Sequence, residues 1–271
     1  MTRYRKRRQR IHVKNLIGIL LIGCVLTVVT TLGYFWYARH RQEQAFDSVT
    51  LCPLGGSPAY IALVFDKTDT YNIVQQRFLK RYFDEFKTKL VPGTRIALYV
   101  IDDRKREILA PDFTVCAPRT GNDANALYEN PKLIRQRWSE RFEKPLDRAI
   151  AAFMKPSEAD ASPIMEILQV VSLSAFPTES SDAKKKIVII SDMLHHTPEW
   201  SHYRGQMDFA TLEQTPYFQR IRTDLQGADV QILYVRRNGM EKLQTKRHAF
   251  FWADYIDAIG GHLSLIEKID G

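Results

Sequence analysis

The chain has 271 residues, of which 45% are hydrophobic and 26% are charged, and its formal net charge is +8. That charge is uneven: residues 1–41 hold nine of the 39 Lys and Arg side chains and no Asp or Glu, so the rest of the chain, with 30 basic and 31 acidic side chains, has a net charge of −1. A nucleic-acid-binding domain needs a basic face, and this balance therefore argues against nucleic acid as a partner.

An uncharged apolar stretch at residues 16–38 follows a basic N-terminal segment. At about 1.5 Å per residue, a helix of this length spans roughly 35 Å, enough to cross a bilayer core of about 30 Å. Basic residues are more numerous before the stretch than after it, which predicts a cytoplasmic N-terminus and a C-terminal part across the membrane. The alternative is a cleaved signal peptide, but the stretch is too long and no small-residue cleavage site follows it.

We therefore expect a basic cytoplasmic arm at residues 1–15, a transmembrane signal anchor at 16–38, a linker at 39–57 and one exported domain at 58–271. The length of the last segment suits a single domain. The chain contains no Asn-x-Ser/Thr sequon, which favours a bacterial periplasm over a eukaryotic lumen. The expected location is the bacterial inner membrane, with the domain facing the periplasm.

The three cysteines divide in the same way. Cys24 lies inside the predicted span, whereas Cys52 and Cys116 lie in the exported part. An even number of cysteines in an oxidising compartment predicts a Cys52–Cys116 disulfide, the alternative being two buried free thiols. Closing so long a loop would stabilise the fold by about 4 kcal/mol in the chain-entropy model.

Apolar strand-like runs alternate with amphipathic helical segments through the exported part. Strands are expected at residues 60–65, 95–101, 106–116, 186–190, 229–235 and 262–266, the third antiparallel to the second, and helices at 72–90, 133–154, 162–174, 216–225 and 242–259. Pro145 can kink or split the second helix, and a long polar loop is expected at 192–214. Strands that alternate with helices predict an α/β fold with a doubly wound, mainly parallel sheet flanked by helices.

Two of these strands end in a carboxylate. Asp66 ends the first, followed by Thr68 and Thr70, and Asp192 ends the fourth. Both would emerge at the carboxyl edge of the sheet, where open α/β folds place their sites. Ser162, just before a helix, can face the same edge. These hard oxygen donors suit Mg²⁺.

Each of these groups also has an ordinary structural interpretation. Ser162 before a proline is often a helix N-cap. Thr68 and Thr70 could cap the helix that follows them, and Asp192 could be a strand-end carboxylate without a ligand.

The order, spacing and strand-end placement of the motifs resemble a von Willebrand factor type A domain, over roughly residues 58–268. That family carries a metal-ion-dependent adhesion site made of Asp-x-Ser-x-Ser after the first strand, a Thr in a later loop and an Asp after a central strand. Here Asp66, Thr68 and Thr70 match the first element with Thr for Ser, Ser162 matches the Thr, and Asp192 matches the last Asp, with Met193 in place of the usual Gly.

The resemblance implies a site for Mg²⁺ or Mn²⁺ whose open coordination position accepts a carboxylate from a protein partner. It implies no catalysis and no small-molecule cofactor. Within the long loop, His195, Trp200 and Tyr203 are expected to form the rim of the binding site. A zinc site is the alternative for this histidine-rich loop, but the spacing is unusual and Pro198 argues against a continuous helix.

The sequence therefore predicts a membrane-anchored, non-enzymatic module that binds a protein partner within an envelope assembly. One alternative is a metal-dependent phosphoester hydrolase that uses the same carboxylates with His195 or His196. A second alternative is a structural domain with an empty site. An aspartyl-phosphate mechanism is disfavoured, because Thr68 stands where that chemistry needs a second Asp.

Overall fold

A computed structural model describes residues 20–37, 46–68, 70–101, 110–122, 124, 129–155, 159–177 and 182–271. The chain divides into two compact units, one covering Met1–Phe46 and Pro53–Gly55 and the other Asp47–Cys52 and Gly56–Gly271. The predicted cytoplasmic arm lies outside the described residues.

The first unit contains a helix, Leu20–Tyr37, that is long and apolar enough to cross a membrane. Its side chains are exposed throughout. Length and composition agree with the predicted anchor at 16–38, of which residues 16–19 and 38 lie outside the description. A signal sequence would satisfy the same test, so retention and orientation stay predictions.

The second unit is an α/β fold. Within its described residues six strands form one sheet in the order β3-β2-β1-β4-β5-β6, with β3 antiparallel to β2 and every other neighbouring pair parallel. The strands are β1 (Ala59–Asp66), β2 (Arg95–Ile101), β3 (Phe113–Cys116), β4 (Lys184–Ser191), β5 (Asp229–Val235) and β6 (His262–Ile269). This confirms the predicted class of a mainly parallel sheet flanked by helices.

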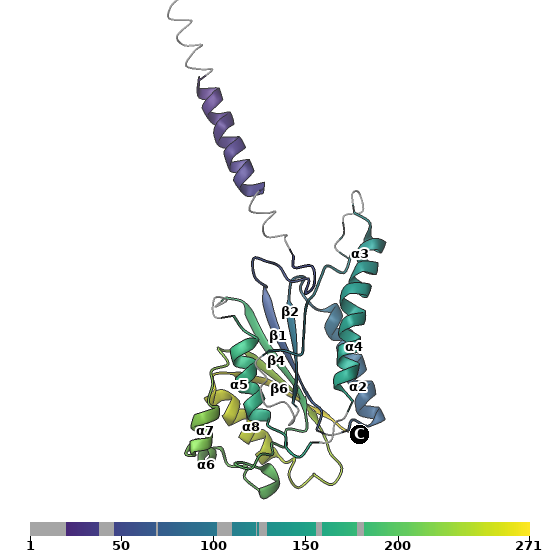
Figure 1. Cartoon of the computed structure of the whole chain (residues 1–271), viewed down its shortest axis with the longest axis vertical. Helices are drawn as coiled ribbons and strands as arrows, with labels where there is room; N and C mark the ends of the chain where they lie inside the picture. Colours follow the sequence, from purple (N-terminus) through teal and green to yellow (C-terminus); the bar gives the residue numbers. More distant parts are fainter. Residues whose placement is uncertain are drawn as a thin grey trace, which may run out of the picture. The chain divides into compact units, whose positions relative to one another are not determined.

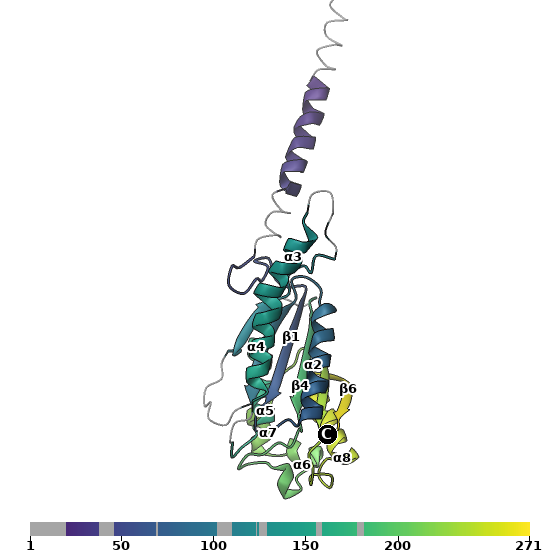
Figure 2. The same cartoon turned by 90° about the vertical axis from the view of Figure 1, so that its right-hand side faces the viewer.

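Helices cover both faces of the sheet, as Figures 1 and 2 show. One face carries α2 (Ile73–Thr88), α3 (Pro131–Trp138) and α4 (Lys144–Phe153), and the other carries α5 (Ile164–Ser174), α6 (Phe209–Glu213), α7 (Pro216–Ile221) and α8 (Lys246–Ala258). The strands supply alternate residues to the two cores: Val64 packs with α5 and α8, whereas Leu63 and Phe65 pack with α2 and α4. Such two-sided burial explains the continuous apolar runs of β1 and β4.

Local sequence signals set several helix boundaries. Asn72 caps α2 through a capping box, in which its side chain accepts from the backbone N–H groups of Val74 and Gln75 and the Gln75 side chain accepts from the Asn72 N–H. The helix expected at 133–154 is interrupted by a π-helical turn, η1 (Ser139–Glu143), and α4 then starts with Pro145 in its first turn. The proline therefore marks the predicted break, because it cannot donate to the preceding turn.

A disulfide joins Cys52 to Cys116, as predicted, across a sequence separation of 64 residues. The Cys116 N–H also donates to the carbonyl of Thr50 at 2.7 Å. The bond and this contact tie the segment before β1 to β3, at one edge of the sheet. Of the strand expected at 106–116, residues 110–116 lie within the description, and β3 covers Phe113–Cys116 of them.

Candidate functional site at the ends of β1 and β4

The carboxyl ends of β1 and β4 lie side by side in the middle of the sheet, where Phe65 pairs with Ile190. From β1 the chain continues to β2 on one side, whereas β4 lies on the other side of β1. The strand order therefore reverses between β1 and β4. In open α/β sheets a ligand site typically lies at this kind of reversal, outside the carboxyl ends of the strands.

Asp66 is the centre of this edge and is completely buried. Its Oδ1 accepts hydrogen bonds from the backbone N–H and the hydroxyl of Thr68, at 3.0 and 2.6 Å. Its Oδ2 accepts from the hydroxyls of Ser191, at 2.7 Å, and Ser162, at 3.4 Å. A buried carboxylate needs such donors to offset its lost hydration, and here it gathers side chains from three separate segments.

The ordinary interpretations of the hydroxyls do not match the structure. Ser162 does not cap α5, whose N-cap is Pro163 without any side-chain cap bond, and its backbone instead forms a two-bond bridge with His196. Thr68 and Thr70 do not cap α2, because Asn72 does. The hydroxyls of Thr68 and Ser162 are therefore aimed at Asp66 by the fold.

Two of the predicted ligand residues, Asp192 and Thr70, contact Arg237. The Asp192 Oδ2 lies 3.2 Å from the Arg237 Nε, and its Oδ1 accepts from the Leu194 N–H at 2.8 Å. Arg237 Nη1 donates to the backbone carbonyl of Thr70, whose side chain is exposed. Asp66, Thr68 and Ser162 are thus brought together directly, whereas Asp192 and Thr70 are linked through an arginine.

Met193 stands where the resembled family usually has Gly, and its backbone is left-handed, with φ of 62°. That conformation costs a non-glycine residue roughly 1–2 kcal/mol. Its carbonyl oxygen accepts a hydrogen bond from the Trp252 Nε1–H at 3.0 Å and lies 3.0 Å from the His248 Nε2. The Met193 side chain is fully buried, so packing and hydrogen bonding hold the strained turn in place.

Three buried histidines pack behind this turn: His195, His202 and His248. Burial lowers the pKa of His195 to about 3 and that of His248 to about 4, and it also lowers the pKa of His202, so all three are neutral at pH 7. The His195 Nε2 lies 3.0 Å from the hydroxyl of Tyr217. No group of three or more His, Cys, Asp or Glu side chains among the described residues is placed to hold a metal ion.

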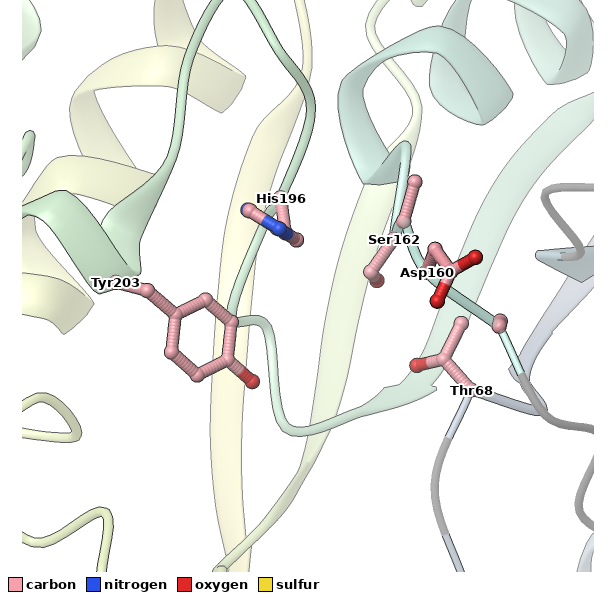
Figure 3. Close-up of a pocket in the computed structure, with 7 residues that line it drawn as sticks. Thr68, Asp160, Ser162, His196 and Tyr203 are labelled. Atoms are coloured by element: carbon pink, nitrogen blue, oxygen red, sulfur yellow. The ribbon is translucent and has the colours of Figure 1, made fainter.

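A pocket of about 260 Å³ opens beside Thr68 and Ser162, whose hydroxyls donate to Asp66. Figure 3 shows His196 and Tyr203 on one side of it and Thr68, Asp160 and Ser162 on the other. Its described lining residues are Thr68, Ala159, Asp160, Ala161, Ser162, His196 and Tyr203.

The predicted rim needs correction. Only Tyr203 of the three rim residues lines the pocket, and its side chain is 45% exposed. His195 and Trp200 are buried, because the loop folds back on α5, α7 and α8 and uses them as core. They hold the loop from behind, and His196 takes the place at the pocket that was expected of His195.

Sequence reasoning missed Ser191, Arg237 and Asp160. Two of them had a usable signal. Ser191 directly precedes the strand-end Asp192, and Arg237 follows the predicted strand at 229–235, whose carboxyl end must lie beside that of β4. Asp160 had no such signal, because no sequence pattern in the loop before Ser162 predicts where the Asp160 side chain points.

The group of oxygen atoms at Asp66 is of the chemical type that a hard divalent cation binds. It offers one carboxylate and hydroxyl oxygens from Thr68, Ser162 and Ser191, within 3.4 Å of the carboxylate oxygens. Mg²⁺ prefers such oxygen ligands, few carboxylates and several retained waters. The second carboxylate, Asp192, has its charge balanced by Arg237.

No known protein-family model matches the chain, and no curated protein sequence is recognisably similar to it.

Proposed function

We propose that the protein is a membrane-anchored, non-enzymatic recognition module that binds a protein partner at the carboxyl edge of its sheet. The observation that carries this proposal is the convergence of Thr68, Ser162 and Ser191 on the buried carboxylate of Asp66. Buried polar groups need partners, but a group of this kind beside an open pocket is also a pre-organised oxygen site. Its location at the carboxyl edge of the sheet, where open α/β folds usually carry their ligand sites, supports the proposal.

Asp66, Thr68 and Ser162 would hold Mg²⁺ or Mn²⁺ in this proposal. The bound ion would supply an open coordination position for a carboxylate of the partner. His196 and Tyr203 would contact the partner around that point, since both line the pocket. Tyr203 suits this role, because an exposed aromatic ring provides contact area at low conformational cost.

The rival proposal, hydrolysis of a phosphoester, has weaker support. A general base must reach the substrate directly or through one water. His195 is completely buried, and its pKa of about 3 makes it a poor base. His196 reaches the pocket, but its Nδ1 lies 2.7 Å from the Ser201 hydroxyl, and the pair ties down the loop. The site thus favours binding over bond cleavage.

The membrane placement rests on two features. The helix Leu20–Tyr37 is long enough for an anchor, and the Cys52–Cys116 disulfide suits an oxidising compartment outside the cytoplasm. Such an anchor would hold the recognition domain in the envelope.

The test uses the full chain in detergent. Mn²⁺ and Mg²⁺ are titrated calorimetrically into the wild type, Asp66→Asn and a matched control, Asp254→Asn, which changes an exposed carboxylate on α8. In parallel, tagged protein is captured from its native membranes with and without EDTA. We expect metal binding and partner capture in the wild type and the control, and loss of both in Asp66→Asn with an unchanged circular dichroism spectrum.

Capture that is equally efficient with EDTA and in Asp66→Asn would contradict the metal-assisted mechanism. Turnover of a phosphoester that disappears in Asp192→Asn would favour the hydrolase instead.

A further inference from the structure

We infer that Arg237 is a built-in cation of this site, which competes with a divalent ion for Asp192 and for the loop between Asp66 and Thr70. This inference rests on the proposed metal site and adds its regulation. The arginine acts as a latch: while it holds Asp192, the site binds a divalent ion weakly.

Arg237 connects two segments whose residues would hold the proposed ion. Its Nε lies 3.2 Å from the Asp192 Oδ2, at the end of β4, and its Nη1 donates to the Thr70 carbonyl, in the loop after β1. The guanidinium also lies 5.7 Å from the centre of the Tyr71 ring. One side chain thus joins the two loops that carry the predicted ligands.

The pair is well shielded from solvent. The side chain of Asp192 is 4% exposed and that of Arg237 is 13% exposed. Charges so placed are screened far less than those at the surface, and the pair is therefore a strong competitor for an incoming cation. Asp192 directly follows Ser191, whose hydroxyl donates to Asp66 at 2.7 Å, so the strand end that carries the Arg237 partner also contacts Asp66.

The backbone around Arg237 is fixed from the other side. The Arg237 N–H donates to the Gln244 Oε1 at 2.8 Å. The Gln244 Nε2 donates to the carbonyls of Val235, at 2.8 Å, and Asp192, at 3.1 Å. Gln244 thus links the main chains of the two partners, so an exchange of partners at Asp192 would move the Arg237 side chain and leave the backbone in place.

Two states of the site follow. In the latched state Arg237 neutralises Asp192 and holds the Thr70 carbonyl. In the open state the guanidinium turns away from Asp192, and Asp66, Thr68, Ser162 and Asp192 would hold the divalent ion. Ion binding must break the Arg237 contacts. The free energy that these contacts contribute therefore weakens the observed binding of the ion by the same amount.

The experiment measures Mn²⁺ binding to the full chain in detergent by the loss of the free Mn²⁺ paramagnetic resonance signal. The variants are Arg237→Gln and Arg237→Lys, and the matched control is Arg119→Gln, which also removes one positive charge from an arginine–glutamate pair, with Glu129. We expect Arg237→Gln to bind Mn²⁺ at least about tenfold more tightly than the wild type, a difference of about 1.4 kcal/mol. The control should bind like the wild type.

Arg237→Lys keeps a charge but loses the planar fork that contacts both loops, so it should show a smaller gain in affinity. It decides the matter if Arg237→Gln fails to fold: a folded Arg237→Lys with wild-type affinity overturns the inference. Wild-type and Arg237→Gln proteins that bind Mn²⁺ equally well also overturn it, while the proposed metal site stands. Absence of binding in both folded proteins overturns the metal site and the latch together.

Discussion

The carboxylate of Asp66 accepts four hydrogen bonds. The shorter of the two to Oδ2 comes from the Ser191 hydroxyl, at 2.7 Å. The other donor to that oxygen, Ser162, is longer, at 3.4 Å. Loss of Ser191 therefore leaves a completely buried charge poorly solvated on one side. Asp66 and Thr68 were found from sequence because they end a strand, but the direction of Ser191 depends on how two distant strands pair.

We predict that Ser191→Ala lowers the free energy of unfolding by about 1–3 kcal/mol, the usual cost of leaving a buried acceptor short of its partner. Urea unfolding followed by circular dichroism measures this. The control is Ser264→Ala, which removes a hydroxyl from the outer strand, where it donates to the Val230 carbonyl at 3.2 Å. Equal effects of the two substitutions would show that Ser191 has no special role.

The buried histidines make stability depend on pH. Burial lowers the pKa of His195 to about 3 and that of His248 to about 4, below the ordinary value of 6.5. The unfolded chain therefore binds more protons than the folded one below pH 6.5. The stabilisation is complete above pH 6.5 and is lost as the pH falls towards 4. Glu166, whose pKa is raised by burial, acts in the opposite direction.

We predict that the free energy of unfolding falls between pH 7 and pH 5 by up to about 2 kcal/mol for each of these histidines. Urea titrations at the two pH values measure the difference. His262→Gln, which changes an exposed histidine on β6, should leave the pH dependence unaltered. A free energy of unfolding that does not fall over this range would contradict the prediction.

At the scale of elements, hydrophobic periodicity located the strands and the long helices well, because burial on one or both faces dictates it. Ends were less predictable. The last strand runs to Ile269, beyond the predicted end at 266, and α7 stops at Ile221, before the predicted 225. These ends depend on sheet pairing and on contacts from distant segments, which local sequence does not encode. Pro145 predicted a break in the long helix, but no sequence signal predicted the π-helical turn η1 that precedes it.

The disulfide should contribute strongly to the stability of the α/β domain. It closes a loop with a sequence separation of 64 residues, which corresponds to about 4 kcal/mol in the chain-entropy model. We predict that Cys52→Ser/Cys116→Ser lowers the urea midpoint strongly and that dithiothreitol has the same effect on the wild type. Cys24→Ser, which removes the free cysteine, should leave the midpoint unchanged. A double variant as stable as the wild type would contradict this.

The capping box of α2 is a second local determinant. Asn72 accepts two backbone hydrogen bonds at 3.0 Å. We predict that Asn72→Ala lowers the free energy of unfolding by about 1 kcal/mol. Asn72→Ser should retain most of the stabilisation by the cap, because serine is also a preferred N-cap residue. Urea unfolding of the wild type and the two variants measures the order of their stabilities. If Asn72→Ala were more stable than Asn72→Ser, the cap would not be the source of the stabilisation by Asn72.

At the scale of the whole molecule, charge asymmetry predicts orientation. Seven basic residues precede residue 16, whereas only Arg39 and Arg41 closely follow the apolar stretch, a bias that predicts a cytoplasmic N-terminus. Alkaline phosphatase fused after Gly271 should be active in a bacterial host, because that enzyme matures only outside the cytoplasm. Replacing the basic residues before residue 16 with Gln should reduce this activity, whereas replacing Arg39 and Arg41 should not. If the fusion were inactive while the intact chain was found in the membrane, the C-terminal part would lie in the cytoplasm and the predicted orientation would be wrong.

The hydrogen bond between Ser191 and Asp66 has a consequence for dynamics, because it joins the two central strands of the sheet. Local unfolding starts at edges and loops and reaches such central strands last. The amides of Phe65 and Ile190 should then exchange with solvent only through global unfolding. A ligand bound at this point would accordingly slow the exchange of the entire sheet by mass action, so its footprint in a hydrogen-exchange map would extend far beyond the residues it touches.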